Sequence, residues 1–205
     1  LGIIRSREMI EAAKITGVKA YHLSETTSDP IYDFGFSKTP EETLGKWGEE
    51  LTYERLIRFI RTYQPDILMP SFQNDDTQHG HHRTMTILSE RAFKDAADPT
   101  VFPKQLKQGL SVWQVKKLYL PVSSADQATT SIVIGKYDPI YGMTYPQLGE
   151  QSRYLHKSQG MGSDIPAAPR QVHLDLKQSA VDTKSQSDLF AGIPYDFNEK
   201  AEKLP

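Results

Sequence analysis

Apolar residues recur at helical spacing in several stretches of the chain and gather into short runs between them. Helices alternating with short apolar strands are typical of an α/β protein, in which helices cover the faces of a sheet. The predicted helices cover residues 3–16, 51–63, 79–97 and 146–157. The predicted strands cover residues 18–23, 66–70, 115–122 and 131–135.

The order of these elements indicates a particular α/β architecture. The run Ile67-Leu68-Met69 is continuously apolar, which suits a central parallel strand that is covered on both faces. The first helix stops at Gly17 and leads into the strand 18–23, as in the second half of a βαβ unit. The strand that should precede this helix is absent from the chain. We therefore expect a three-layer, Rossmann-like α/β fold with a mostly parallel sheet that lacks its first strand.

Two polar segments complete the expected organisation. Residues 24–48 are rich in polar residues with scattered Pro and Gly, so they predict a long loop. After Ser163 the apolar content falls, and residues 165–205 predict a linker with one or two local strands. We accordingly divide the chain into a domain over residues 1–163, incomplete at its N-terminus, and an extension over residues 164–205 toward a possible further domain.

Composition excludes several classes of function. The 24 Lys and Arg against 26 Asp and Glu give a formal charge of −2, which argues against binding to nucleic acid or to anionic membranes. No window approaches the roughly 18 apolar residues that a membrane span needs. Because there is no Cys, any metal site must be built from His and carboxylate. The absence of Gly-rich dinucleotide and P-loop motifs disfavours nucleotide-dependent redox chemistry.

The densest chemical signal is a histidine cluster. His79, His81 and His82 lie just past the carboxyl end of a predicted strand, where open α/β sheets bind ligands. His79 and His82 are three positions apart, so they face the same side of a helical turn. Imidazole is a common zinc ligand, and a nearby carboxylate such as Asp76 could complete or orient a site. The alternative is a polar turn with histidines present by chance, but three clustered histidines favour a functional site.

At this point the sequence resembles a known family. The stretch Pro65-Asp66-Ile67-Leu68, Asp76 and His79-Gly80-His81-His82-Arg83-Thr84 resembles the second motif of the LmbE/PIG-L family of zinc-dependent N-deacetylases. Similar matches occur upstream, around Arg5-x-x-Glu8 and Asp33-Phe34-Gly35-Phe36, and downstream, in residues 145–160 and 188–193, which resemble the longer multidomain bacterial members. The first motif of the family, A-H-P-D-D-E, is absent from this chain.

The resemblance implies a chemistry and a set of roles. It implies removal of acetyl from an N-acetylated amino sugar or related glycoconjugate by water activated on Zn²⁺, or on another divalent metal. His82 corresponds to a metal ligand, and His79 would stabilise the oxyanion and protonate the leaving amine. Asp76 could orient either histidine, whereas His81 is expected to point off the site. Arg5 and Asp33 match positions that line the sugar pocket. The missing motif would supply the other metal ligands and the general base.

Other readings remain open at this stage. The chain could be a non-catalytic carbohydrate-binding relic of the same fold, or a polar α/β domain whose histidines have no role. His156 could approach the pocket or lie on a solvent-facing turn. The expected partner is a small-molecule or glycan substrate carrying an N-acetyl group, with no nucleic acid and no membrane span. Because large bacterial members are typically exported, an extracellular or cell-surface location is favoured. The oligomeric state is left open.

Overall fold

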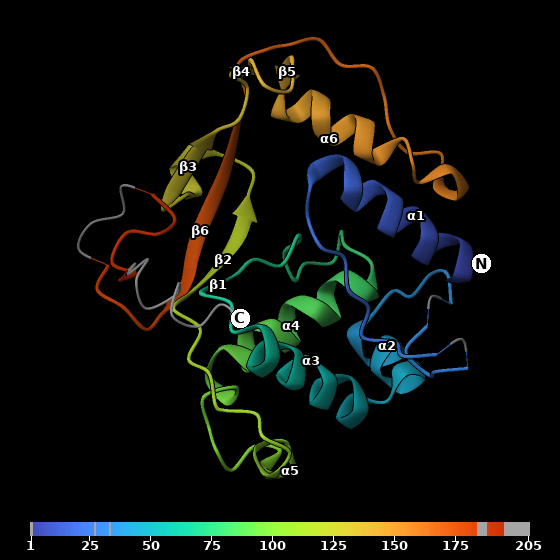
Figure 1. Ribbon diagram of the computed structural model, residues 1–205, viewed down its shortest axis with the longest axis vertical. Coiled ribbons are helices and arrows are strands. Elements are labelled where there is room, and N and C mark those ends of the chain that lie inside the picture. Colours follow the sequence, from blue (N-terminus) through green and yellow to red (C-terminus); the bar gives the residue numbers. More distant parts are fainter. Residues whose placement is uncertain (1, 27, 33, 184–187, 195–205) are drawn as a thin grey trace.

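The computed structural model describes residues 2–26, 28–32, 34–183 and 188–194. Its helices are α1 (Gly2–Thr16), α2 (Pro40–Trp47), α3 (Glu49–Tyr63), α4 (Gly80–Asp95), α5 (Pro103–Lys107) and α6 (Tyr145–Arg153), with 3₁₀ turns at Ala125–Gln127 and Lys157–Gln159. Its strands are β1 (Ile67–Leu68), β2 (Lys117–Val122), β3 (Thr130–Val133), β4 (Tyr137–Asp138), β5 (Met143–Thr144) and β6 (Gln171–Ser179). Helices and strands are interspersed along the chain, which confirms the α/β class (Figure 1).

The larger described sheet has the strand order β1-β2-β6-β3. β1 pairs with β2 in parallel, and β6 pairs antiparallel with both β2 and β3. β1, β2 and β3 therefore all run in one direction and β6 runs against them, so the described sheet is mixed. A separate two-stranded sheet joins β4 to β5.

Two sequence-based expectations for the first half of the chain are wrong. Residues 18–23 form no strand, because Tyr21 instead packs its ring against Phe59 and Tyr63 of α3. The expected long loop over residues 24–48 contains α2. This helix begins with a strong start signal, in which the Thr39 side chain accepts a hydrogen bond from the Glu42 N–H and Pro40 occupies the first turn.

The short strand β1 also differs from its expected place. We expected a central strand over residues 66–70, but β1 has two residues and lies at the edge of the described sheet. It is held there by its neighbours, since the N–H groups of Lys116 and Lys117 both donate to the Asp66 carbonyl oxygen. The predicted element type is confirmed and its position is corrected.

The segment after residue 163 contributes a main strand of the sheet. β6 has nine residues, pairs with six positions of β2 and four of β3, and buries Leu174. Its sequence alternates Val172, Leu174 and Leu176 with polar residues, the period of a half-buried strand. The expected local strand is thus present, but it belongs to the domain's sheet rather than to a free linker.

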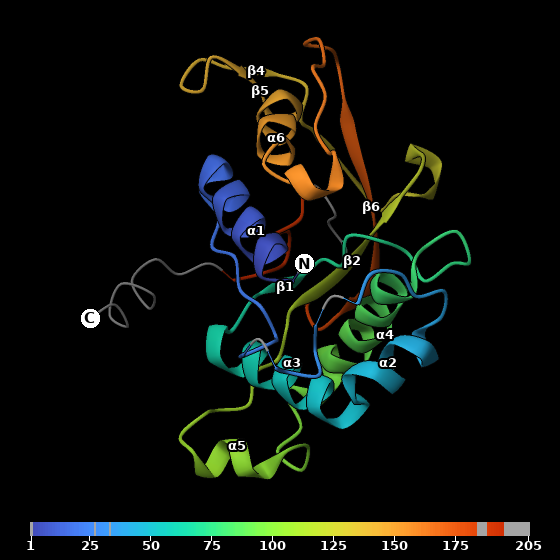
Figure 2. The same cartoon turned by 90° about the vertical axis from the view of Figure 1, so that its right-hand side faces the viewer.

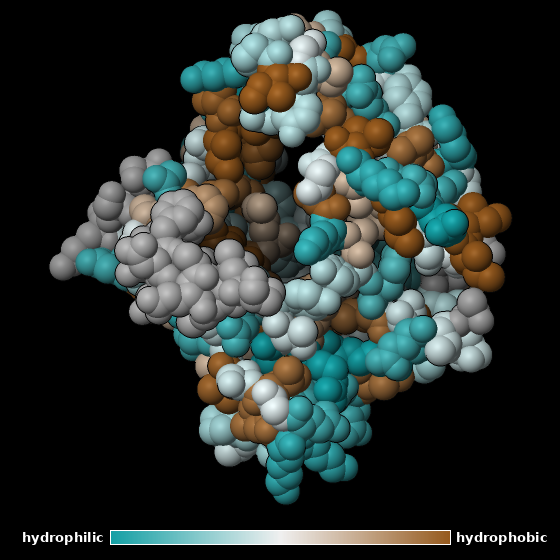
Figure 3. Space-filling model, viewed as in Figure 1, coloured by the Kyte–Doolittle hydropathy of each residue, from teal (hydrophilic) through white to brown (hydrophobic). Residues whose placement is uncertain are grey.

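The hydrophobic core lies between α3, α4 and the sheet. Its buried members come from these elements and the segment before β2: Tyr53, Leu56, Ile57, Ile60, Leu88, Ala92, Phe93, Ala96, Val115, Leu118 and Leu120. α1 and α6 pack against each other beside this body, and Ser152 of α6 donates a hydrogen bond to the Ala12 carbonyl oxygen at 2.9 Å (Figures 1 and 2). In the space-filling view the surface is hollowed between α1 and the sheet (Figure 3).

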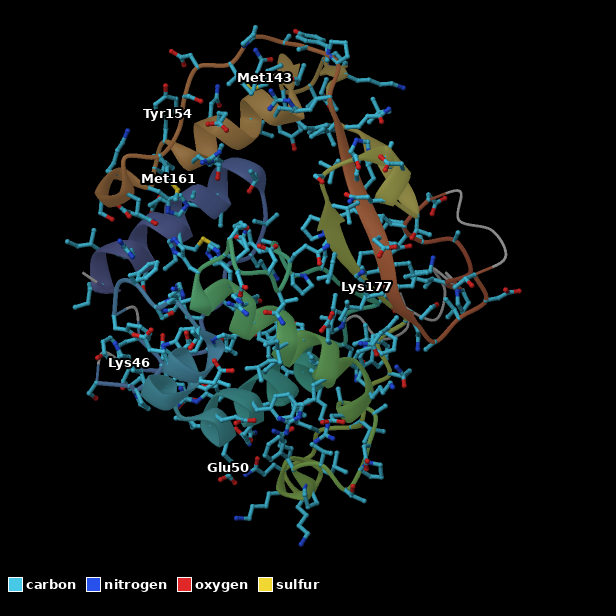
Figure 4. All side chains as sticks on the ribbon, turned by 180° about the vertical axis from the view of Figure 1, so that it is seen from behind. Lys46, Glu50, Met143, Tyr154, Met161 and Lys177 are labelled. Carbon is cyan, nitrogen blue, oxygen red and sulfur yellow. The ribbon has the colours of Figure 1, made fainter. Side chains whose placement is uncertain are left out.

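The chain folds back on α6 after its last turn. Gly162 lies so close to Tyr154 that an added Cβ would be 2.7 Å from the Tyr154 backbone nitrogen. Figure 4 shows Tyr154 and Met161 on this α1–α6 side of the molecule and Lys177 on the opposite side, on β6. None of the described helices combines the length and apolar content that a lipid bilayer crossing requires.

Candidate active site

The loop of residues 71–79 leads from the carboxyl end of β1 into α4. The loop is tied to β2 and to α4: the Gln73 side-chain amide donates to the Pro121 carbonyl oxygen at 2.7 Å, and the Thr86 hydroxyl donates to the Phe72 carbonyl oxygen at 2.8 Å. His79 has an extended backbone and is the N-cap of α4, with no side-chain capping bond. The loop therefore delivers His79 to the strand end at which α/β proteins bind ligands.

The structure brings His79 and His82 together. Their ring centroids lie 5.5 Å apart with an angle of 8° between the ring planes. Phe72 also stacks on His82, with the ring centroids 3.9 Å apart and an angle of 3° between the ring planes. Phe36 contacts His79 edge-to-face at 4.9 Å. The predicted pairing of the two histidines on one side of the first helical turn is thus observed.

Burial favours the neutral form of His82. Desolvation lowers the pKa of His82 below its ordinary value, and the positive charge of a protonated His79 lowers it further. The buried Nδ1 atom of His82 has no hydrogen-bond partner within the described part of the chain. A neutral imidazole with an unpaired nitrogen is the form that binds metal ions.

The donor set for a metal is incomplete in the described residues. Zinc in proteins takes three or four protein ligands. Over residues 2–26, 28–32, 34–183 and 188–194, no group of three or more His, Asp and Glu side chains converges on one point. His82 fits the role of one ligand, because its Nδ1 is buried and unpaired. The described residues alone do not complete a zinc site.

Asp76 does not make the contact that we expected. Its carboxylate lies 2.9 Å from the Arg83 guanidinium, and its side chain is 96% exposed. Arg83 also donates to the Asn74 side-chain oxygen at 2.9 Å, so the arginine ties the loop to the first turn of α4. Asp76 in this arrangement stabilises the loop, and its action on either histidine stays a prediction.

His81 points away from the other two histidines, as predicted. Its ring packs against Phe34 at 4.4 Å and Trp47 at 5.0 Å, and its Nδ1 lies 3.0 Å from the Ser37 hydroxyl. Lys46 adds a cation–π contact to the far side of this cluster, 4.1 Å from the Phe34 centroid. His81 therefore joins α4 to α2.

Of the two residues predicted to line a sugar pocket, the structure describes only Arg5. Asp33 lies outside the described residues. Arg5 lies half-buried on α1, one turn before Glu8. The Glu8 carboxylate accepts hydrogen bonds from the Ser158 N–H at 2.6 Å and from the Ser158 hydroxyl at 2.7 Å, and these bonds lower the pKa of Glu8. His156 begins the same turn, and its buried Nδ1 has no hydrogen-bond partner in the described chain.

Sequence reasoning missed a cavity beside the site. It has a volume of about 530 Å³ and lies at the carboxyl end of β2, next to the loop that carries the histidines. It is lined by residues 73–75 and 121–123 with Gln127, Asp175 and Lys177. The depression is open to solvent. Asp175 and Lys177 come from β6, about a hundred positions after the loop, so no local motif could have indicated this wall.

The first part of the chain is similar to a known protein family. Residues 1–93 match the family described as PIG-L, GlcNAc-PI de-N-acetylase. A 1D-myo-inositol 2-acetamido-2-deoxy-alpha-D-glucopyranoside deacetylase of Frankia alni is 33% identical over 91 residues, which are 42% of this chain and 30% of that protein. A second such deacetylase, of Frankia casuarinae, is 39% identical over 64 residues, which are 31% of this chain and 19% of that protein. The match thus spans less than a third of these relatives.

A solved structure supports the fold. The N,N'-diacetylchitobiose deacetylase of Pyrococcus horikoshii, complexed with its inhibitor MPG, superposes with a TM-score of 0.52 at 18% identity. The match covers 77% of this chain and 50% of that protein. At this identity the likeness concerns the fold, and it extends past the first 93 residues.

Proposed function

Because residues 1–93 carry PIG-L family sequence, we propose that the protein is a deacetylase of N-acetylated amino sugars or related glycoconjugates. The observation that carries this proposal is the His79–His82 pair, which lies inside the matched region at the end of a parallel strand. The curated relatives and the structural neighbour are named as deacetylases of sugars that carry an acetamido group, which supports this substrate class.

Hydrolysis of an acetamide requires an attacking water, stabilisation of the tetrahedral oxyanion and a proton for the leaving amine. We assign the last two tasks to protonated His79. Its side chain is exposed and makes no capping bond, so it is accessible to a substrate. Arg5 and Asp33 are proposed to bind sugar hydroxyls, since charged side chains form short, strong hydrogen bonds with such groups.

We further propose that a divalent metal, most simply Zn²⁺, is held in part by His82. When bound, such an ion activates water for attack on the carbonyl carbon. The neutral, unpaired His82 supports this role. The described residues contain no convergent group of three His, Asp and Glu side chains, so they do not complete the ligand set by themselves.

The alternative function is that of a relic that binds N-acetylated sugars without cleaving them. Such a relic needs the pocket but no complete metal site. Acetate release separates the two, because the relic would bind the sugar and release none.

The test uses the intact protein with N-acetylglucosamine and N,N'-diacetylchitobiose as substrates. We expect His82→Ala to lose stoichiometric zinc and activity together. His79→Ala should keep its zinc and lose roughly 10²- to 10⁴-fold in turnover, the usual contribution of a general acid. His22→Ala, at an exposed histidine outside the cluster, is the matched control. Full turnover in the His79→Ala protein would refute the acid role.

A separate measurement addresses the metal. The 205-residue chain by itself is expected to bind zinc weakly or substoichiometrically, because His82 is its one ligand carried over from the family motif. Tight one-to-one binding of zinc by this chain would show that the ligands are assigned wrongly.

A further inference from the structure

The aromatic ring of Phe72 has no part in the chemistry proposed above. We propose that Phe72 is a positioning residue: its ring holds the His82 imidazole, and through it the His79 imidazole, in a single orientation for the reaction. This inference rests on the proposed deacetylase function and adds a residue to it.

The three rings form one stack. Phe72 and His82 are parallel within 3°, and His82 and His79 within 8°. The nitrogens of an imidazole lie at its edge, so a ring that is stacked on its face can bond only in its own plane. The bonds that the nitrogens of His79 and His82 can form therefore lie in nearly parallel planes. Phe36 contacts the ring of His79 edge-to-face at 4.9 Å.

The stack orients a ring that has no hydrogen bond at Nδ1. The buried Nδ1 of His82, which we assign to the metal, has no hydrogen-bond partner in the described chain. The contact that instead fixes the plane of this ring is the 3.9 Å stack on Phe72.

Phe72 is itself fixed relative to His82. The single Thr86 hydroxyl proton is shared between the carbonyl oxygens of both residues, with the hydroxyl oxygen 2.8 Å from that of Phe72 and 3.2 Å from that of His82. The next residue in the loop, Gln73, is bonded to Pro121 of β2. The backbone on each side of the stack is thus anchored, although the Phe72 side chain remains 37% exposed at the surface.

The experiment compares Phe72→Leu, which keeps an apolar side chain of similar size but removes the ring, with Phe72→Tyr, which restores a ring. In the intact protein we expect Phe72→Leu to lower kcat roughly 10- to 100-fold, the effect of a misplaced catalytic group, with little change in KM. Phe72→Tyr should recover most of the turnover. Phe59→Leu, which removes a ring from the Tyr21–Tyr63 cluster, controls for a general loss of packing.

A second readout does not depend on turnover. The stacked Phe72 ring should shift the His82 ring protons upfield in the proton NMR spectrum, and Phe72→Leu should abolish this shift. Wild-type kcat in the Leu variant, or an equal loss in the Leu and Tyr variants, would overturn the proposal. If the protein is active but its His82 protons are not shifted, the stack and the role of Phe72 are refuted, while the deacetylase function stands. A wild-type protein that shows the shift but releases no acetate would contradict the deacetylase function, and this role with it.

Discussion

The backbone N–H of Gly80 donates a hydrogen bond to the carbonyl oxygen of Ser37 at 2.8 Å. The first residue of α4 therefore lies directly against the segment that precedes α2. A Cβ atom at position 80 would collide with the Thr39 carbonyl oxygen and lie 2.6 Å from the Ser37 hydroxyl oxygen. A side chain at this position would push α4 away from α2, and the histidines on either side of Gly80 would move with it.

Gly80→Ala is accordingly expected to destabilise the protein. Overpacking at a closed contact costs about 1–3 kcal/mol, and here the groups in the way are largely backbone. Urea unfolding measures the change. Gly45→Ala is the control, since nothing lies within 4 Å of an added Cβ in α2 and Ala is favoured over Gly by about 1 kcal/mol in a helix. Equal stability of the Gly80→Ala and wild-type proteins would contradict the close approach.

Arg61 of α3 is fully buried and bonded to neutral acceptors. Its guanidinium donates to the carbonyl oxygens of Ala96 at 3.1 Å and Asp98 at 2.8 Å, and to the Gln105 side-chain oxygen at 3.1 Å. Burial lowers its pKa below the ordinary value for arginine. The side chain ties α3 to the connection between α4 and α5.

Replacing Arg61 by Met should cost at least about 3 kcal/mol, because several buried carbonyl oxygens lose their donor. Arg58→Met, one turn away, removes an ion pair with Glu54 that is partly exposed, and should cost at most about 1 kcal/mol. The difference between the two free energies of unfolding is the quantity to measure. Similar values would show that the Arg61 network contributes little.

The lowered pKa of His82 gives stability a defined dependence on pH. Below about pH 6.5, the ordinary pKa of histidine, the unfolded chain binds a proton that the folded protein resists. The contribution of neutral His82 is thus fully present above that pH and is lost as the pH falls through this value toward the lower folded-state pKa. As the pH is lowered from 7.5 to 5, the urea midpoint of unfolding should fall less steeply in the His82→Gln protein than in the wild type. A slope equal to that of the wild type would argue against the shift.

Asp76→Asn tests whether this residue does more than hold the loop. Loss of a single exposed ion pair with Arg83 should change the free energy of unfolding by at most about 1 kcal/mol. A residue that orients a catalytic or ligating histidine should, in addition, lower turnover roughly 10- to 100-fold when its charge is removed. Wild-type turnover in a stable Asp76→Asn protein would show that Asp76 only stabilises the loop.

Local sequence signals predicted the parts of the site that depend on local geometry. The apolar period of residues 51–63 and 79–97 was sufficient to place α3 and α4, because each helix buries one continuous face. The spacing of His79 and His82 was sufficient to place them together on one turn. α2 was missed because its start signal at Thr39 and Pro40 lies within an otherwise polar segment.

What the sequence did not reveal depends on contacts between distant residues. The Phe72 stack requires the loop of residues 71–79 to fold back on α4, which no spacing rule encodes. The assignment of residues 171–179 to a main strand depends on pairing with β2, some fifty positions earlier. A nine-residue alternating pattern indicates a strand but does not indicate which strand it will join.

The position of β6 between β2 and β3 has a consequence for the order of folding. β2 and β3 are adjacent in sequence, yet within the described sheet they do not pair with each other and are joined only through β6. During synthesis the chain must therefore keep β2 and β3 apart, with their edges unpaired, until residues 171–179 emerge from the ribosome. Pairing over such sequence separations is slow, and an exposed strand edge is prone to association with other chains in the interval. The strand that completes the sheet last thus governs how long the nascent domain is vulnerable to aggregation.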